Sequence, residues 1–276
     1  LDAKVRSVGP DEALGARGTR AAIVVTAGLG AAQKQAMLDA ARKHLLRILG
    51  PNCLGLLSPH GRLNASFAHA GVQADGLAFV SQSGALVTAM LDWANGRGIG
   101  FSHFVSLGER ADVDFGDLLD WLASDARTRA ILLYIESIEA PRKFMSAARA
   151  AARNKPVLVV KAGRTPQGQA AATSHTGALA GSDLVYDAAI RRAGMLRVDT
   201  LQDLFVAAET LAHFRGTSGA LVPAGSNQVL DRLTIVTNGG GAGVMAADAA
   251  ALAGVSLAPL DAARDAPLRR GRQAGR

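Results

Sequence analysis

Short apolar runs of strand length alternate with alanine- and leucine-rich runs of helix length along most of this chain of 276 residues. The stretch GLAFVSQSGALVTAMLDWANGRG, residues 76–98, shows the unit: an apolar run, a tight turn of small residues and a helical segment. Strands that alternate with helices of about 10–15 residues predict βαβ units and a parallel sheet. The expected strands are apolar throughout, as is typical when helices cover both faces of a sheet. We therefore expect an α/β fold built on parallel sheets.

Two irregular stretches divide this pattern into three units. We expect linkers at 61–75, which is polar, and at 216–231, which contains glycine, serine and proline. They separate a first unit at 1–60, a central unit at 76–215 and a third unit at 232–276. The chain begins in the middle of a helix–strand pattern and ends in the arginine-rich run LRRGRQAGR, so we expect it to be a piece of a longer protein.

Charge and composition limit the class of partner. The net charge is +7 and the pI about 10.2, but the basic residues are mostly scattered arginines with few aromatic residues among them. We therefore expect no nucleic acid, and instead a small polyanion such as a nucleotide or coenzyme A. No run approaches the ~20 apolar residues of a membrane span, so we expect no membrane. The single cysteine suits a reducing compartment, so we expect the cytoplasm.

The turns after the expected strands are where such sheets bind ligands. In VSQSGAL, residues 80–86, an apolar run leads into a helix that Ser83, Gly84 and Ala85 open. Small residues let the backbone approach a ligand, and the free N–H groups of a helix N-terminus favour an anion. An N-cap serine in a tight turn explains the same residues without a ligand, so both interpretations stay open.

A second such turn, TNGGGAGVMAAD at 237–248, contains Gly240, Gly241 and Gly243 after an apolar run. Consecutive glycines cost chain entropy when they become ordered, so they usually mark a turn or a close backbone approach. The stretch matches neither the full dinucleotide fingerprint nor the lysine-containing phosphate loop. By itself it is a weak indication of anion binding.

Two further turns each hold a titratable residue. His175 sits among small and hydroxyl residues in TSHTGALAGSD, 173–183. A partly unprotonated imidazole can act as a nucleophile or base, although most loop histidines are simply exposed to solvent. Glu136 ends the apolar run ILLYIES, 131–137, where a carboxylate can accept the N–H of an imidazole and fix its tautomer. A capping or solvated glutamate is the alternative interpretation.

A further turn, in LGPNCLGL at 49–56, holds Pro51, Asn52 and Cys53. Cys53 is either a reactive thiol or, as is more usual for a lone cysteine between apolar residues, an inert core residue. Two helix starts suited to an anion, a histidine and a glutamate thus all fall where one α/β crevice could collect them.

Six segments resemble, in their order along the chain, the NDP-forming acyl-CoA synthetase family, whose members include the α subunit of succinyl-CoA synthetase and ADP-forming acetyl-CoA synthetase. The likeness runs from about residue 20 to about residue 257. Within the family, the sequence is most similar to long bacterial members that are fused to a GNAT acetyltransferase domain. The segments are GPNCLGLLSP, GLAFVSQSGAL, SLGERADVDFGDLLDWLASD, AILLYIES, KPVLVVKAGR and SHTGALAGSD.

The resemblance implies an acid–thiol ligase that interconverts acyl-CoA, phosphate and a nucleoside diphosphate with a carboxylic acid, coenzyme A and the triphosphate. Phosphate passes through a phosphohistidine, which His175 matches, and Glu136 matches the glutamate that holds this histidine. The remaining matches are Ser83, Gly84 and Ala85 at one phosphate-facing helix, Gly240, Gly241 and Gly243 at a second, and Pro51, Asn52 and Cys53 near the thiol end of coenzyme A.

The resemblance also implies domains and partners. Residues 1–60 resemble the second half of a Rossmann-like coenzyme A-binding domain, 76–215 a flavodoxin-like ligase domain, and 232–276 the start of a second flavodoxin-like unit. The family's glycine-rich coenzyme A loop is expected to precede residue 1. An ATP-grasp domain or subunit, which would bind ATP or ADP with Mg²⁺, is expected as a partner, in an oligomer. We expect the chain alone to be incomplete, with no metal site of its own.

Two other functions compete with this one. The chain could be a non-catalytic coenzyme A- or acyl-CoA-binding region that regulates an attached GNAT protein lysine acetyltransferase. It could also be a flavodoxin-like protein that binds FMN, but the aromatic residues that usually flank a flavin are missing from these turns.

Overall fold

The computed structural model describes residues 9–170, 181–213, 232–237 and 239–258. The contacts between Cα atoms divide the chain into two units, Leu1–Ser218 and Gly219–Arg276. Each unit is described by itself below.

The first unit begins with a small βαβ lobe. Strands β1 and β2 pair in parallel, with Ala22 opposite Ile48. Helix α2 covers them through Met37 and Ala41, which are buried together with Ile48. The elements are α1 (Gly9–Ala16), β1 (Ala21–Ile23), α2 (Ala31–Arg42) and β2 (Arg47–Leu49).

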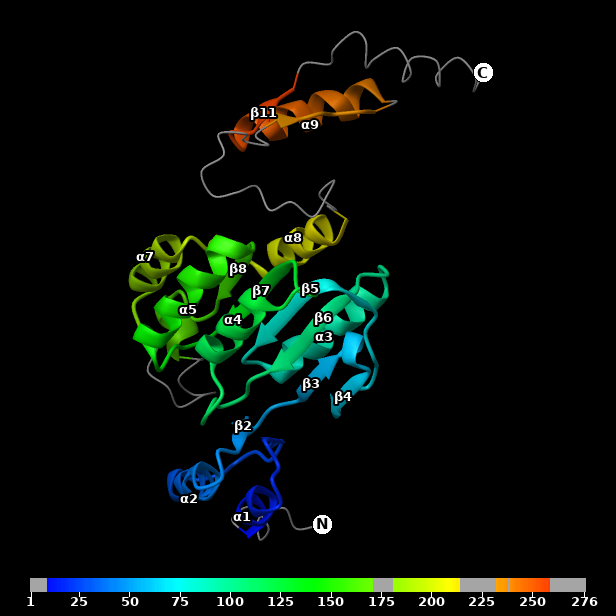
Figure 1. Cartoon of the computed structure of the whole chain (residues 1–276). Coiled ribbons are helices and arrows are strands. Elements are labelled where there is room, and N and C mark those ends of the chain that lie inside the picture. The colour runs from blue at the N-terminus through cyan, green and yellow to red at the C-terminus, as the bar shows by residue number, and fades with distance from the viewer. Residues whose placement is uncertain (1–8, 171–180, 214–231, 238, 259–276) are drawn as a thin grey trace. The chain divides into compact units, whose positions relative to one another are not determined.

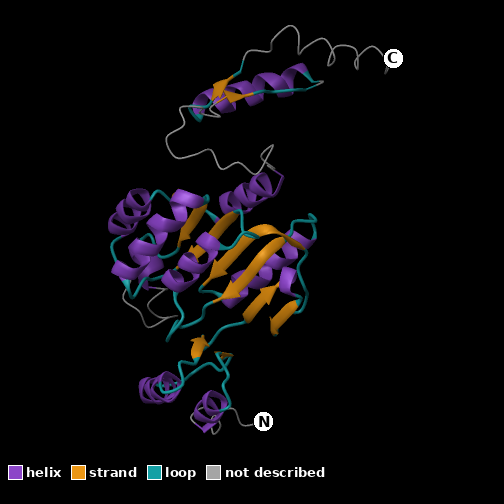
Figure 2. Ribbon diagram, in the orientation of Figure 1, coloured by secondary structure: helices purple, strands orange, loops and turns teal. Residues whose placement is uncertain are grey.

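A seven-stranded sheet in the order β4-β3-β6-β5-β7-β8-β9 forms the centre of the first unit (Figure 2). The five strands from β6 to β9 in this order are parallel to one another, which confirms the expected α/β class. The strands are β3 (Gly55–Ser58), β4 (Leu63–Ser66), β5 (Ala74–Ser81), β6 (Phe101–Ser106), β7 (Ala130–Ile135), β8 (Val157–Lys161) and β9 (Leu196–Val198).

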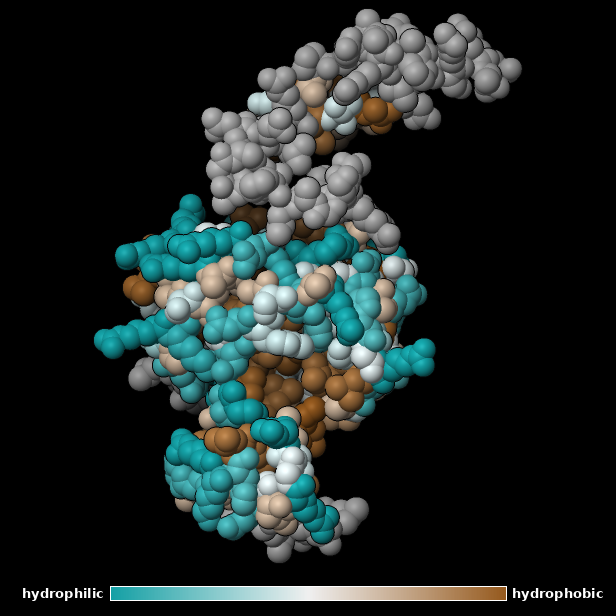
Figure 3. Space-filling view, in the orientation of Figure 1, coloured by the Kyte–Doolittle hydropathy of each residue, from teal (hydrophilic) through white to brown (hydrophobic). Residues whose placement is uncertain are grey.

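Helices cover both faces of this sheet, as the apolar strands predict (Figure 1). On β5, Val80 packs with residues of α4, α5 and α7, whereas its neighbour Phe79 packs with residues of α3 and α8. Both side chains are fully buried, so this strand is apolar on both faces. The surface over α4, α5 and α7 is largely hydrophilic (Figure 3). The helices are α3 (Gly84–Asn95), α4 (Phe115–Ser124), α5 (Pro141–Asn154), α7 (Asp183–Ala193) and α8 (Leu201–His213).

Two strands of the sheet differ from the sequence-based expectation. Strand β3 runs antiparallel to both β4 and β6. It therefore belongs to the central sheet, whereas we expected residues 1–60 to form a unit of their own. Strand β4 lies within 61–75, which we expected to be an irregular linker. As the edge strand of the sheet, β4 has a partner on one side only, so its polar residues Asn64 and Ser66 lack the continuous apolar pattern of a buried strand. The expected linker at 216–231 lies outside the described residues.

The second unit contains one βαβ motif. Strands β10 (Arg232–Leu233) and β11 (Ser256–Leu257) pair in parallel, and helix α9 (Gly240–Leu252) connects them. The sequence predicts this order of strand, glycine turn, helix and strand. Among the helices of the described ranges in either unit, none has the length and apolar character that a membrane span requires.

Candidate active site

The carboxyl ends of β5, β6, β7 and β8 lie at one edge of the sheet, because these strands are parallel. At the end of β5, Ser83 caps helix α3: its hydroxyl oxygen accepts a hydrogen bond from the N–H of Leu86 at 3.4 Å. The hydroxyl of Ser81 accepts the N–H of Ser83 at 3.0 Å and shapes the turn. The N-cap interpretation of Ser83 is therefore confirmed. The first N–H groups of the helix, at Gly84 and Ala85, have no acceptor within the helix and suit an anion.

Glu136 follows β7 at the same edge, and Gln82 ties its backbone to the turn that precedes α3. The side-chain oxygen of Gln82 accepts hydrogen bonds from the N–H of Glu136 at 2.5 Å and from the N–H of Ser137 at 3.0 Å. Glu136 is only 8% exposed, so it is neither a solvated nor a surface residue. The structure thus joins two of the turns that the sequence singles out.

Tyr134, the next-to-last residue of β7, precedes Glu136 by two positions. Burial raises the pKa of the Tyr134 phenol to about 12, and the charge of Glu136 and a hydrogen bond to it act in the same direction. A phenol that stays protonated at neutral pH is a hydrogen-bond donor to the carboxylate.

The turn that holds Pro51 and Asn52 packs against the loop that follows β6. Its carbonyl oxygens accept two hydrogen bonds of 2.9 Å, one from the N–H of Glu109 to Pro51 and one from the N–H of Ala111 to Gly50. Pro51 is buried, whereas Asn52 is exposed and adopts a left-handed backbone conformation with a φ of 55°. The loop after β6 also bonds to the end of β5, because the N–H of Leu107 donates to the carbonyl oxygen of Ser81 at 2.8 Å. The turns after β2, β5 and β7 are therefore linked through the loop after β6 and through Gln82.

Cys53 points away from this surface. Its side chain is 3% exposed, and its thiol donates to the carbonyl oxygen of Val24 at 3.4 Å. Burial raises the pKa of the thiol to about 11. Of the two interpretations of this residue, the inert core cysteine is the one that the structure shows.

The Cys53 thiol is expected to react with Ellman's reagent in the native protein at least ~100-fold more slowly than in the protein unfolded in guanidinium, both at pH 8. A pKa of about 11 leaves roughly one thiol in a thousand ionised at that pH, and the thiolate is the nucleophile. Absorbance at 412 nm follows the reaction. A native protein that releases a full equivalent as fast as the unfolded chain would contradict the buried position of this side chain.

Gly108 is the residue that allows the Pro51 turn to approach the loop after β6. Its φ is +58°, and a Cβ atom there would lie 2.2 Å from the Pro51 carbonyl oxygen and 2.4 Å from that of Asn52. We expect Gly108→Ala to lower the free energy of unfolding by about 3 kcal/mol, through both backbone strain and displacement of the turn.

Gly98→Ala is the matched control, because Gly98 has a similar φ of +66° and nothing within 4 Å of the added Cβ. It should cost only about 1 kcal/mol. Guanidinium unfolding followed by the fluorescence of Trp93 and Trp121, the chain's two tryptophans, measures both variants. Equal losses in the two variants would show that the close approach at Gly108 is unimportant.

Sequence reasoning missed two residues of this surface. Gln82 was not singled out within VSQSGAL, and Arg110 was not singled out at all. The Arg110 guanidinium is 6% exposed and donates to the Ser137 hydroxyl at 3.0 Å and to Glu139 at 2.9 Å. The sequence predicts that an arginine in a polar loop is exposed to solvent. The structure instead shows that Arg110 is buried and has a left-handed backbone conformation with a φ of 54°.

Other predicted site residues cannot be joined to this surface. His175 lies outside the described residues. Gly240, Gly241 and Gly243 form the first turn of α9 after the N-cap Gly239, as expected for a helix start, but they belong to the second unit. A Cβ added at Gly240 or Gly241 would meet nothing within 4 Å. In the described part of the chain, no three His, Cys, Asp or Glu side chains form a group that could hold a metal ion.

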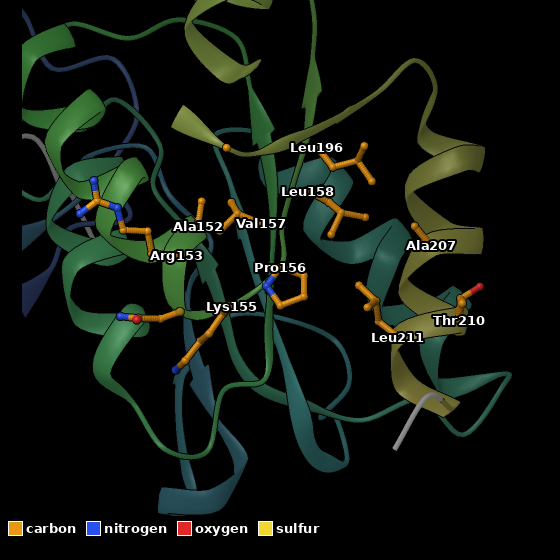
Figure 4. Close-up of a pocket in the computed structure, with 12 residues that line it drawn as sticks. Ala152, Arg153, Lys155, Pro156, Val157, Leu158, Leu196, Ala207, Thr210 and Leu211 are labelled. Carbon is orange, nitrogen blue, oxygen red and sulfur yellow. The ribbon is translucent and has the colours of Figure 1, made fainter. Parts of the chain in front are cut away.

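A cavity of about 660 Å³ lies at the opposite edge of the sheet, where β8 begins (Figure 4). Its lining is mostly apolar and includes Pro156, Leu158, Leu196 and Leu211. The amino group of Lys155 is engaged elsewhere, because it donates to the carbonyl oxygens at the end of α4. Since chemistry-bearing groups gather at the other edge, this cavity is not the candidate active site.

Comparison with known proteins gives a consistent result. Residues 74–211 match the family model described as succinyl-CoA ligase like flavodoxin domain. The chain is 41% identical over 253 residues, 90% of its length, to acetate–CoA ligase [ADP-forming] I of Archaeoglobus fulgidus, and covers 35% of that protein. It is 40% identical to acetate–CoA ligase [ADP-forming] I subunit alpha of Pyrococcus furiosus, with 89% of this chain and 52% of that one covered.

A solved structure agrees. The acetyl-coenzyme A synthetase 1 of Candidatus Korarchaeum cryptofilum, in complex with phosphate and ADP, superposes with a TM-score of 0.80 at 36% identity. The match covers 92% of this chain and 53% of that one. The chain therefore spans about a third to a half of the length of these relatives.

Proposed function

Because this chain belongs to the NDP-forming acyl-CoA synthetase family, we propose that it is part of an ADP-forming acyl-CoA ligase that carries phosphate on His175. A phosphate oxygen attacks the acyl carbon, and the coenzyme A thiolate leaves. An imidazole nitrogen of His175 then attacks phosphorus, and the carboxylate leaves. Finally the phosphoryl group moves from His175 to an oxygen of ADP, which completes ATP.

The observation that carries this proposal is the link between Glu136 and the start of helix α3. Gln82 holds the backbone of Glu136 and Ser137 beside the turn whose next residues, Ser83 and Gly84, open the helix. One surface therefore offers a buried carboxylate for an imidazole N–H and a helix N-terminus for a phosphoryl group. Both groups are needed at the same place if a histidine is to take up phosphate there.

The remaining roles follow from the family and stay proposals. Pro51 and Asn52, with Cys53 behind them, lie near the thiol end of coenzyme A, and Gly240, Gly241 and Gly243 form the second phosphate-facing helix start. We assign the β1–α2–β2 lobe within 1–60 to a coenzyme A-binding domain and 232–276 to part of a third domain. The ligase domain comprises 76–215 together with β3 and β4, which pair with its sheet. An ATP-grasp subunit or domain binds ADP with Mg²⁺, in an oligomer that works in the cytoplasm.

Radiolabelled phosphate tests the proposal. The chain is incubated with acetyl-CoA and labelled phosphate, or with labelled ATP and an ATP-grasp partner from a relative. We expect label that is stable in base and lost in acid, as a phosphoramidate bond requires, and release by added ADP in the presence of that partner. Label that is stable in acid, or none from either donor, would overturn the proposed function.

A further inference from the structure

A partly buried ion cluster joins helix α7 to β9, the edge strand that lies two places along the sheet from β7, which Glu136 follows. Arg197, on β9, has an 8% exposed side chain, and its guanidinium contacts Asp183 at 2.5 Å and Asp187 at 3.4 Å. The two aspartates are four residues apart on α7, so they share one face of the helix. The Nε atom of Arg197 is buried, and it is without a hydrogen-bond partner among the described residues.

Two further contacts hold the same helix. Arg164, shortly after β8, pairs with Asp199 at 2.7 Å and lies 3.8 Å from Asp183. The hydroxyl of Tyr186 accepts the N–H of Ile138 at 3.1 Å, which ties α7 to the turn that contains Glu136. On its other side, the Tyr186 ring lies 4.4 Å from the amino group of Lys161, which is 2% exposed.

The energetics make this cluster a poor device for stability. Only Arg197 is buried, since the side chains of Asp183 and Asp187 are 25% and 31% exposed. Water therefore screens both pairs, and what they contribute is offset by the cost of removing the guanidinium from water. The unpartnered Nε atom adds a further cost. Helix α7 is already packed on the sheet through Ile190 and Ala193, which are buried in the apolar core. The two hydrogen bonds from the Arg197 guanidinium to Asp183 and Asp187 instead fix the position and direction of the first turn of the helix.

We propose that Arg197, together with Asp183 and Asp187, positions the first turn of α7 at the strand edge beside Glu136. This inference rests on the proposed function, because α7 begins eight residues after His175. Arg164 and Asp183 flank the segment that carries His175, and their contact brings both ends of that segment to one ion cluster. Closing the ends of a segment in this way raises the effective concentration of a group within it near a fixed site.

The test replaces Arg197 and both aspartates together, so that the buried guanidinium is not left without its partners. The triple variant Arg197→Met, Asp183→Asn, Asp187→Asn should keep the wild-type Tm or exceed it, yet take up phosphate on His175 at least tenfold more slowly. The single variant Arg197→Lys keeps the positive charge but cannot bond to both aspartates as a guanidinium does. Its rate of phosphate uptake should lie between those of the triple variant and the wild type. The control is Arg191→Met, which removes the exposed pair between Arg191 and Asp187 on the same helix and should leave the rate unchanged.

Hydrogen exchange gives a second readout that does not need activity. The backbone amides of 187–190 bond to the first turn of α7, so they should exchange at least tenfold faster in the triple variant while global stability is unchanged. If these amides keep their protection, or if the triple variant is labelled at the wild-type rate, the positioning role is refuted. If the wild type takes up no label but the amides lose protection, the proposed function fails and the positioning of α7 stands.

Discussion

With asparagine in place of His175, the chain is expected to take up no acid-labile phosphate from acetyl-CoA and labelled phosphate. Asparagine keeps a polar side chain of similar size but offers no nitrogen lone pair that can form a phosphoramidate. The loss should therefore be complete rather than partial. Scintillation counting of protein recovered under basic conditions measures it.

His60→Asn is the matched control, since His60 is exposed and its ring nitrogen lies 3.0 Å from the carbonyl oxygen of Asp75, away from the turn that carries Glu136. That variant should label as the wild type does. If the His175 variant labels equally well, phosphate travels by another residue, and the mechanism has to be abandoned.

The exchange of Glu136 for glutamine should slow the appearance of label by about 10²–10⁴-fold, the usual range when a group that stabilises transition-state charge or orients a reacting histidine is removed. The amide fits the same space but lacks the negative charge that holds an imidazole N–H and stabilises the ring as its other nitrogen attacks phosphorus. Rapid quenching at intervals after donor is added gives the rate. Differential scanning calorimetry of the Glu136→Gln variant should show a Tm almost equal to that of the wild type.

Glu139→Gln provides the comparison for this variant. Glu139 follows in the same turn, but its side chain is 64% exposed and pairs with Arg110. The exchange should alter the rate by less than about twofold, because the Glu139 carboxylate is largely exposed and glutamine keeps a side-chain oxygen that can accept the hydrogen bond from Arg110. A Glu136 variant whose rate equals that of the Glu139 variant would remove the carboxylate from the mechanism.

Most strands and helices could be predicted because several local sequence features indicate the same element. Around β5 and α3, the apolar run, the small-residue turn and the N-cap Ser83 all predict a strand followed by a helix, and the structure has both. The antiparallel pair β3 and β4 was missed for the opposite reason. Edge strand β4 is short and polar, and its pairing depends on contacts such as the close approach of Gly55 to Ala65, which the periodicity of apolar residues does not show.

The sequence predicts individual residues of the candidate site but not the contacts that join them. Sequence placed Ser83 and Glu136 at strand ends, because a carboxyl edge follows from parallel pairing. It gave no reason to expect Gln82 as their link, since Gln82 and Glu136 are 54 positions apart. The burial of Arg110 and Arg197 was equally hidden, because charged residues are almost never fully buried unless a partner from elsewhere in the chain neutralises them.

The attachment of α7 also sets a tether length. Asp183 is held on the sheet by Arg197, and His175 precedes it by eight positions. A fully extended chain advances by at most about 3.6 Å per residue, so the backbone of His175 lies within a radius of about 29 Å from that of Asp183. Under the proposed function, the phosphate that this histidine takes up or gives away has to come within that radius plus the length of the histidine side chain. A partner that delivers ADP under the same proposal would have to bring its phosphates equally close, whatever the distance between the rest of the two surfaces.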